Sequence, residues 1–189
     1  MKIKNYYISD LHLGHSNALR FDVRPFKTIE EQDEKIIENI NKTVTQQDNI
    51  YFLGDFSWYD PHKTAELIKR IKCKNRYLLI GNHDRWCKSS ECKKLFQGIY
   101  DLKMINDENR EVVLCHYPLA VWNKSHRGSF HLYGHVHRNL ADNGMNDNHT
   151  ILNHPEMKNA INVGCMLDYI DYIPRTLDYL LSVKEINKG

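Results

Sequence analysis

The sequence predicts a mixed α/β (α+β) fold in which two β-sheets pack as a sandwich and helices flank them. Short apolar runs rich in β-branched and aromatic residues recur along the chain, and helical patterns separate the early ones. The later runs follow one another closely. Strands that alternate with helices favour parallel pairing, whereas closely spaced strands favour antiparallel pairing. A β-sandwich of mixed sheets between helices accommodates both.

The predicted elements follow from these runs in order. Strands are expected where apolar runs are bounded by Gly, Asn or Asp, at residues 3–8, 49–53, 76–80, 112–115, 130–133 and 160–163. A helix is predicted over 28–44 from isoleucines at helical spacing, and another over 61–71, which opens with Pro61. A shorter helix is predicted over 90–96. Residues 139–149 are polar and aperiodic, which indicates an exposed loop.

Length and charge limit the possible classes of protein. The 189 residues suit one globular domain with its own core, and because no linker or repeat divides them we expect a single domain over 1–189. Lys and Arg number 26 against 24 Asp and Glu, so the charge balance does not indicate a dedicated nucleic-acid binder. A nucleic-acid substrate stays open as an alternative that composition does not favour.

The sequence also predicts a cytoplasmic protein that does not act in a membrane. It contains no run of about 18 apolar residues, and its first residues lead straight into a strand pattern rather than a signal peptide. The five cysteines are odd in number and lack C-x-x-C pairs, which argues against a disulfide framework and a thiolate zinc site. A nucleophilic Cys115 beside His116 is a weaker alternative to a buried strand cysteine.

Side chains that commonly bind metals follow five of the predicted strands. They are Asp10 and His12, Asp55, Asn82 with His83 and Asp84, His116, and His135 with His137. Strand ends meet at one edge of an α/β sheet, so these side chains are expected to converge. Within each pair spaced two apart, a continuing strand would direct both side chains to the same face. Glycines at 54, 81 and 134 allow close approach in this crevice.

The chemistry of this donor set indicates the kind of metal. Carboxylate, imidazole and amide oxygen are present without thiolate. This combination suits Mn²⁺, Fe, Zn²⁺, Ni²⁺ or Co²⁺ in five- or six-coordinate sites and fits poorly with a structural zinc. A chance placement of seven such residues at strand ends is a much weaker explanation.

In order, the motifs D-x-H, G-D, G-N-H-D, H and G-H-x-H resemble those of the calcineurin-like metallophosphoesterase superfamily, and the short phage and bacterial members most closely. The resemblance runs from Asp10 to His137 and implies a four-layer α/β/β/α sandwich with two divalent ions, Mn²⁺ first among them. The implied ligands are Asp10, His12, Asp55 and His137 for one ion, and Asp55, Asn82, His116 and His135 for the other. The chain departs from many relatives in having Tyr117 and Pro118 after His116, where those have Gly.

The resemblance also implies a mechanism. Two ions about 3.5–4 Å apart would clamp phosphate oxygens and lower the pKa of a water, so no protein nucleophile is needed. His83 is expected to protonate the leaving oxygen, with Asp84 orienting its ring. Phosphate contacts are expected, from their position on neighbouring loops, at His15, Arg20, Arg24 and Arg127, with solvated surface charge as an equal alternative.

The predicted activity is hydrolysis of a small nucleotide-like or cyclic phosphodiester, because short gaps between motifs leave no room for a cap domain. The alternatives are a phosphomonoesterase, a nuclease and a binding scaffold with a decayed metal site. A phosphoprotein phosphatase is disfavoured because Asp84, not Glu, follows G-N-H. Aromatic residues that could stack a base, although packing is their commoner role, are Trp58, Tyr59, Trp86 and Trp122. Structural or surface roles are expected for His62, His131, His149 and His154.

Overall fold

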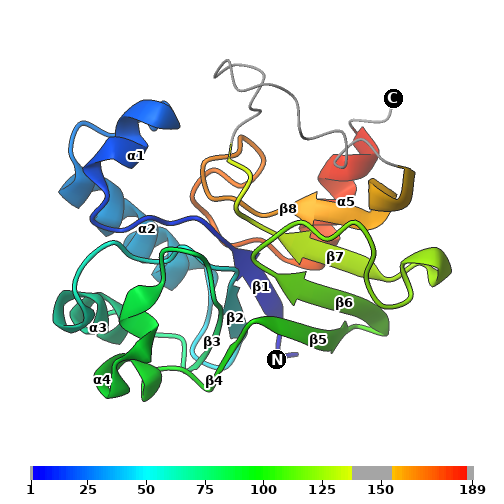
Figure 1. Cartoon of the computed structure of the whole chain (residues 1–189), viewed down its shortest axis with the longest axis horizontal. Coiled ribbons are helices and arrows are strands. Elements are labelled where there is room, and N and C mark those ends of the chain that lie inside the picture. Colours follow the sequence, from blue (N-terminus) through cyan, green and yellow to red (C-terminus); the bar gives the residue numbers. More distant parts are fainter. Residues whose placement is uncertain (1, 138–154, 187–189) are drawn as a thin grey trace.

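The computed structural model describes residues 2–137 and 155–186, which form two four-stranded sheets (Figure 1). The first sheet contains β1 (Asn5–Ile8), β2 (Asn49–Phe52), β3 (Asn75–Leu79) and β4 (Gly98–Tyr100) in that order. All of its strands are parallel. Their carboxyl ends therefore lie at the same edge.

The second sheet is mixed. It contains β5 (Leu102–Asp107), β6 (Arg110–Cys115), β7 (Phe130–Tyr133) and β8 (Ala160–Asn162), again in sequence order. The β5–β6 pair is an antiparallel hairpin, whereas β6–β7 and β7–β8 are parallel. The predicted antiparallel portion is thus confined to one pair, and β6, β7 and β8 end at the same edge.

Helices cover the outer sides of both sheets, as predicted. In Figure 1 the first four helices lie beside the first sheet, and the last lies beside the second. They are α1 (Ser16–Phe21), α2 (Ile29–Thr43), α3 (Pro61–Lys69), α4 (Ser90–Lys93) and α5 (Leu177–Ile186). Because α4 has only four residues, it is shorter than the predicted helix over 90–96.

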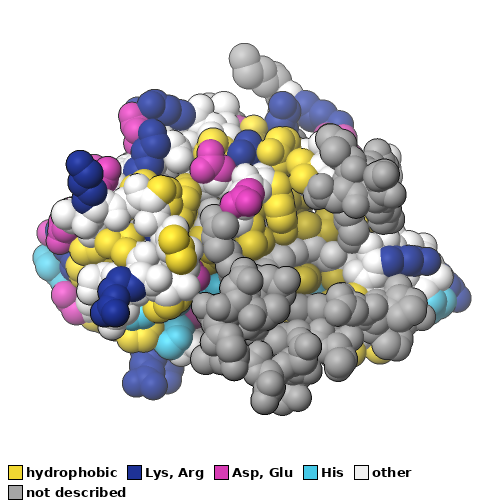
Figure 2. All heavy atoms as spheres, turned by 90° about the horizontal axis from the view of Figure 1, so that it is seen from above, with side chains coloured by type: hydrophobic (Ala, Val, Ile, Leu, Met, Phe, Trp, Pro, Cys, Tyr) yellow, Lys and Arg dark blue, Asp and Glu magenta, His cyan; other side chains and the backbone are white. Residues whose placement is uncertain are grey.

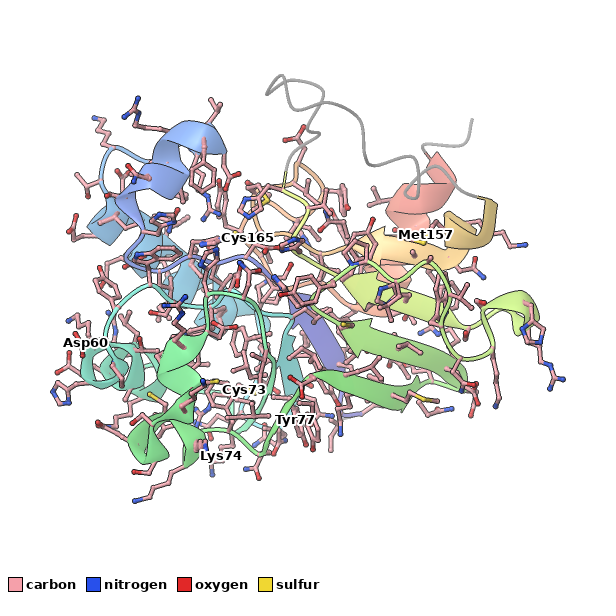
Figure 3. The ribbon with its side chains drawn as sticks, in the orientation of Figure 1. Asp60, Cys73, Lys74, Tyr77, Met157 and Cys165 are labelled. Carbon is pink, nitrogen blue, oxygen red and sulfur yellow. The ribbon has the colours of Figure 1, made fainter. Side chains whose placement is uncertain are left out.

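Side-chain caps fix where the two predicted long helices begin. The Thr28 hydroxyl accepts the Glu31 N–H at 3.2 Å, and the Glu31 carboxylate accepts the N–H of Lys27, the residue before the cap, so the pair resembles a capping box. Asp60, labelled in Figure 3, accepts two N–H groups of the first turn of α3, and Pro61 occupies the first helical position. The loops before these helices are thereby held in place.

The two sheets share one apolar core and are joined directly through the end of β1. Tyr7, Ile8, Phe52, Leu114 and Leu132 belong to the same buried cluster, although they come from both sheets. Beyond β1, the Ser9 N–H donates to the carbonyl of residue 163 at 2.9 Å, and the Ser9 carbonyl accepts the N–H of residue 165 at 2.9 Å. Strand ends from both sheets consequently meet in one place.

All five cysteines are buried and free. Cys73 and Cys165, labelled in Figure 3, come from different parts of the fold. Cys115 lies buried at the end of β6, and burial raises the pKa of its thiol, which favours the strand-packing interpretation over a nucleophile. Across residues 2–137 and 155–186, every helix is too short or too polar to cross a bilayer.

Candidate metal centre

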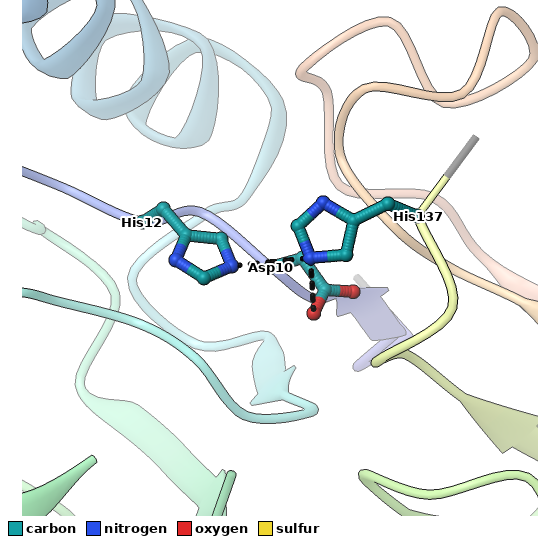
Figure 4. A group of neighbouring side chains, drawn as sticks. All are labelled: Asp10, His12 and His137. Carbon is teal, nitrogen blue, oxygen red and sulfur yellow. Dashed lines mark hydrogen bonds and ion pairs between the residues drawn. The ribbon is translucent and has the colours of Figure 1, made fainter. Parts of the chain in front are cut away.

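Six of the predicted ligands converge into two adjacent groups beyond the strand ends. Within each group the ligand atoms all lie within 4.8 Å of one another. The groups are Asp10, His12 and His137, and Asp55, His116 and His135. Figure 4 shows the rings of His12 and His137 facing each other beside the Asp10 carboxylate. These residues come from the ends of strands in both sheets.

The backbone reaches this arrangement through left-handed turns rather than continuing strands. β1 ends at Ile8 and β7 ends at Tyr133, so the expectation that the paired residues stay on extended strands is wrong. Positive φ angles occur at four ligand residues: Asp10 (57°), His12 (50°), Asp55 (53°) and His135 (68°). Each such residue costs on the order of 1–3 kcal/mol, and strain of this kind concentrates at functional sites.

Two glycines allow the ligand side chains to pack against the backbone, as the sequence predicted. A Cβ at Gly54, where φ is +88°, would lie 2.4 Å from His116 Nδ1. A Cβ at Gly134 would lie 2.6 Å from Asp10 Oδ2. Neither position can hold a larger residue without displacing a ligand.

Hydrogen bonds orient His116 so that its free nitrogen faces other acceptors. Its Nδ1 donates to the Leu53 carbonyl at 2.8 Å, and in a neutral ring this leaves a lone pair on Nε2. That Nε2 lies 3.1 Å from Asn82 Oδ1 and 3.5 Å from Asp55 Oδ2. Asn82 Oδ1 is also 3.1 Å from His135 Nδ1. A cation among these acceptors would satisfy them together.

The other group has the same character. His137 Nδ1 donates to Asp22 Oδ1 at 2.7 Å, which directs Nε2 toward His12 Nε2 at 3.3 Å. Burial and the nearby His137 and Arg24 lower the pKa of His12, so its ring is neutral. Burial also lowers the pKa of His137, but the bond to Asp22 and the charge of Asp10 outweigh it and raise the pKa overall. The His137 Nε2 position therefore favours positive charge, and a metal ion there would displace a proton.

The distances fit bound divalent ions. Ligand atoms held at about 2.1 Å from one ion, at right or tetrahedral angles, lie roughly 3.0–3.4 Å apart. The His12–His137 and His116–Asn82 separations fall in this range. Asp55 Oδ2 is 3.7 Å from His12 Nε2 and 3.5 Å from His116 Nε2, so this carboxylate lies between the two groups. The donor set thus fits a pair of first-row divalent ions.

Asp22 supports the first group and was not found from the sequence. Its two oxygens bind His137 Nδ1 and the Arg24 guanidinium, and carboxylates of this kind orient metal-binding histidines. Arg24 does not have a free fork for phosphate, contrary to the sequence-based expectation. It is buried, and its five N–H donors bond to Asp22, Gln32 and the carbonyls of Asp10 and Leu11.

His83 lies beside the centre, whereas Asp84 has a different role from the one expected. The His83 N–H donates to Asp55 Oδ1 at 2.9 Å, and its ring centroid is 5.7 Å from that of His12. The Asp84 carboxylate accepts the N–H groups of Asp55, Phe56 and Gly81 and the indole N–H of Trp86. Asp84 therefore braces the Asp55 turn rather than orienting the His83 ring. Burial raises the pKa of Asp84 to about 6, which leaves it ionised at neutral pH.

The other expected substrate contacts separate into near and distant residues. His15 lies at the centre, where its ring stacks on Trp58 with centroids 4.0 Å apart, and Arg20 is exposed on α1. Arg127 is distant, because it lines a hollow with Arg110, the first residue of β6. The six residues of β6 span roughly 17–20 Å, and His116 follows its other end. The expectation that Arg127 contacts the phosphate is therefore wrong.

The remaining aromatic and histidine residues singled out in the sequence include both buried and exposed side chains. Trp86 and Trp122 are buried, and their indole N–H groups bond to Asp84 and Ser129, so these two rings serve packing. Tyr59 is half-buried, whereas Trp58 is exposed. His131 is buried between Val113 and Tyr117 carbonyls, which confirms its structural role, and His62 is an exposed residue of α3. His149 and His154, with the whole of the loop expected over 139–149, lie outside the described residues.

Two adjacent histidine and carboxylate groups at the strand ends of a two-sheet α/β sandwich define a class of metal-binding phosphoesterases. The sequence profile described as calcineurin-like phosphoesterase matches residues 4–172, and the chain belongs to this family. It is 31% identical over 188 residues to the protein MJ1445 of Methanocaldococcus jannaschii, covering 98% of this chain and 93% of the relative.

A solved structure shows the same fold. The protein AQ665 from Aquifex aeolicus superimposes with a TM-score of 0.69 at 24% identity, and the match covers 99% of each chain. The Pseudomonas putida nuclease MPE is more distant, with a TM-score of 0.47 at 20% identity over 70% of this chain and 60% of that chain. The likeness to AQ665 supports the two-sheet fold.

Proposed function

We propose that this chain is a phosphodiesterase that depends on two divalent metal ions, Mn²⁺ first among them, and acts on a small nucleotide-like or cyclic phosphate. The observation that carries the proposal is the Asp55 carboxylate between two groups of facing acceptors, with the His83 ring beside them. We place the enzyme in the cytoplasm, which its five free cysteines support.

The ligand assignment follows the two groups. Asp10, His12, His137 and Asp55 would hold one ion, and Asp55, Asn82, His116 and His135 the other. When bound, the ions supply charge stabilisation to the phosphate oxygens and a water of lowered pKa. The chain contributes the orientation of each ligand, because the Leu53 carbonyl fixes His116 and Asp22 fixes His137.

His83 supplies the proton that the leaving oxygen needs. Its backbone is tied to Asp55 Oδ1, so the ring is held at a fixed place beside the metal ligands. A ring nitrogen of His83 then donates a proton to the departing alkoxide as general acid. Asp84 holds the Asp55 turn in place by accepting the N–H groups of Asp55 and Phe56, and it acts only through that turn.

The charge distribution on one face of the molecule supports a small substrate over a long nucleic acid. In the face drawn in Figure 2, basic and acidic side chains are interspersed over the described residues, without a continuous basic track. A nuclease that follows a backbone normally has such a track. The intact ligand groups support an enzyme over a binding scaffold.

The test compares metal-loaded protein with two variants on a monoester, an activated diester and a dinucleotide. We expect Asp55→Asn to lose both bound Mn²⁺ and turnover. His83→Ala should keep Mn²⁺ but lose roughly 10²- to 10⁴-fold in kcat with the dinucleotide. Its loss with bis-p-nitrophenyl phosphate should be smaller, because p-nitrophenolate leaves without a proton.

Three outcomes would contradict the proposal. A preference for p-nitrophenyl phosphate over the diesters would indicate a phosphomonoesterase. An equal loss of kcat for both diesters in His83→Ala would show that His83 is not the general acid. Tight binding of two ions without turnover of any ester would favour the scaffold.

A further inference from the structure

Exposed aromatic rings gather around the candidate metal centre. Among the described residues, the most exposed large aromatic side chains are Phe21 (44%), Trp58 (47%) and Tyr117 (42%). All three rings approach histidines of the two ligand groups: Trp58 lies 6.4 Å from His12, Phe21 lies 5.6 Å from His137, and Tyr117 lies 4.8 Å from His135, between centroids. Exposed apolar surface concentrated at a polar site is typical of a binding surface.

The rings flank both ligand groups. Phe21 and Trp58 adjoin the group that contains His12 and His137. Tyr117 adjoins the other group, with its ring 4.9 Å from that of His116. A phosphate held between the groups would therefore have an aromatic surface on either side. Only a diester has a substituent to place on each.

Among these three rings, Trp58 has the orientation and the surroundings that best suit stacking on a ligand. Its ring is stacked on His15 with an interplanar angle of 7°, which fixes its orientation. It also lies 4.4 Å from the His83 ring, the proposed proton donor for the leaving oxygen. Trp58 and His83 line a hollow of about 380 Å³ together with Ser57, Tyr59, Arg85 and Trp86. This volume is within the range of pockets that hold small organic ligands.

We infer that the substrate is a linear phosphodiester with a planar ring system on each ester group, and that Trp58 stacks on the ring of the leaving group. This inference rests on the proposed function and narrows it, because a cyclic nucleotide has one base and cannot contact both sides. Tyr117 binds the ring that stays on the phosphate. His15 acts as a positioning residue for Trp58.

Kinetics test the inference with paired substrates. We expect wild-type Mn²⁺-loaded protein to prefer dithymidine phosphate over ethyl thymidine phosphate, which has one ring. Trp58→Ala should lower kcat/KM for the dinucleotide by roughly 5- to 150-fold, the usual effect of one base stack, and change the ethyl ester much less. Trp58→Phe should restore most of the loss. Met104→Ala, which removes an exposed side chain on β5, is the matched control.

A binding measurement tests the same site without turnover. Thymidine is added to the Mn²⁺-loaded protein while tryptophan fluorescence is recorded, and Trp122, which is buried and does not line the hollow, is the reference. We expect quenching that disappears in Trp58→Phe. If quenching occurs but no ester is hydrolysed, the proposed activity is wrong and the ring site stands. If esters are hydrolysed but Trp58→Ala slows both substrates equally, or thymidine causes no quenching, the ring site is wrong.

Discussion

Asp22 is buried, and each of its oxygens has a separate partner. One oxygen accepts the His137 Nδ1–H at 2.7 Å, and the other accepts two N–H groups of Arg24. Arg24 in turn holds the carbonyls of Leu11 and Asp10, so a single ion pair connects a ligand histidine to the turn that carries two more ligands. Asp22 and Arg24 thus fix the first ligand group from outside it.

We predict that Asp22→Asn weakens Mn²⁺ binding by about 10- to 100-fold. The amide can satisfy either His137 or Arg24, but its NH₂ must then face an N–H donor of the other. Calorimetric titration of the metal-free protein with Mn²⁺ measures the change in affinity. Asp178→Asn removes an exposed carboxylate paired with Arg110 and should leave Mn²⁺ binding unchanged. Equal affinities for wild type and Asp22→Asn would show that Asp22 has no role in the metal site.

Replacement by alanine is expected to affect Mn²⁺ binding at Gly134 but not at Gly128. A Cβ at Gly134 would lie 2.5 Å from Ser9 Oγ and 2.6 Å from Asp10 Oδ2, whereas at Gly128 the space is open but φ is +89°. We expect Gly134→Ala to lose Mn²⁺ binding and turnover, since Asp10 must move. Gly128→Ala should cost about 1 kcal/mol of stability with full activity. Calorimetric titration and thermal unfolding of both variants decide this, and full Mn²⁺ binding by Gly134→Ala would contradict it.

At the scale of elements, the turn after β3 depends on one carboxylate. Asp84 gathers N–H groups from the Asp55 turn and from its own turn, so it joins the ends of β2 and β3. We predict that Asp84→Asn destabilises the protein by about 1–3 kcal/mol, because its NH₂ must face a buried backbone donor. It should also weaken Mn²⁺ binding through Asp55. Denaturant unfolding and Mn²⁺ titration measure the two effects.

The matched control is Thr28→Ala, which removes the cap of α2, a helix that carries none of the candidate ligands. It should cost about 1 kcal/mol and leave Mn²⁺ affinity unchanged. If Asp84→Asn loses stability but keeps its Mn²⁺ affinity, as Thr28→Ala should, then the hydrogen bonds of Asp84 do not support the metal site.

The sequence was sufficient for elements with strong local patterns. β1, β2, β3, β6, β7 and β8, and the long helices α2 and α3, follow apolar runs or helical spacing and were predicted near their observed positions. β4 has three residues and α1 has six, too few for a periodic signal, and β5 alternates exposed and half-buried residues, with Leu102 and Met104 on its exposed face. α5 was also missed.

The same distinction applies to the site. The convergence of six candidate ligands could be predicted because they lie within a few residues of the ends of apolar strands, and strand ends meet by topology. Asp22 and Arg24 could not, because whether a charged side chain is buried and paired depends on what packs over it. Arg127 was misplaced because the sequence does not show at which end of β6 and β7 its loop lies.

For the whole molecule, the two ligand groups unite both sheets. Asp10 and Asp55 follow strands of the first sheet, and His116 and His135 follow strands of the second. The groups form only when the sheets are packed together, so ions held by them would bind the folded chain far better than the unfolded one. Metal binding is therefore expected to stabilise the entire fold.

We predict that Mn²⁺ raises the melting temperature and that a chelator lowers it. An ion at 100 times its dissociation constant adds about 2.7 kcal/mol per site. For a chain of this length, that corresponds to roughly 5–10 °C per occupied site. Ions would also relieve the repulsion among facing acceptors, and the four left-handed ligand residues would be held by bonds that offset their strain. Thermal unfolding with EDTA and with excess Mn²⁺ measures the shift.

Two variants determine how the shift is shared between the sites. His12→Ala removes a ligand of one group only, so it should keep about half of the Mn²⁺-induced rise, whereas Asp55→Asn affects both groups and should abolish most of it. Because removal of the Asp55 charge also relieves repulsion with neighbouring carboxylates, Asp55→Asn should melt at or above the chelated wild type. A Mn²⁺-induced rise in Asp55→Asn as large as that of the wild type would show that the ions stabilise the protein from outside these two groups.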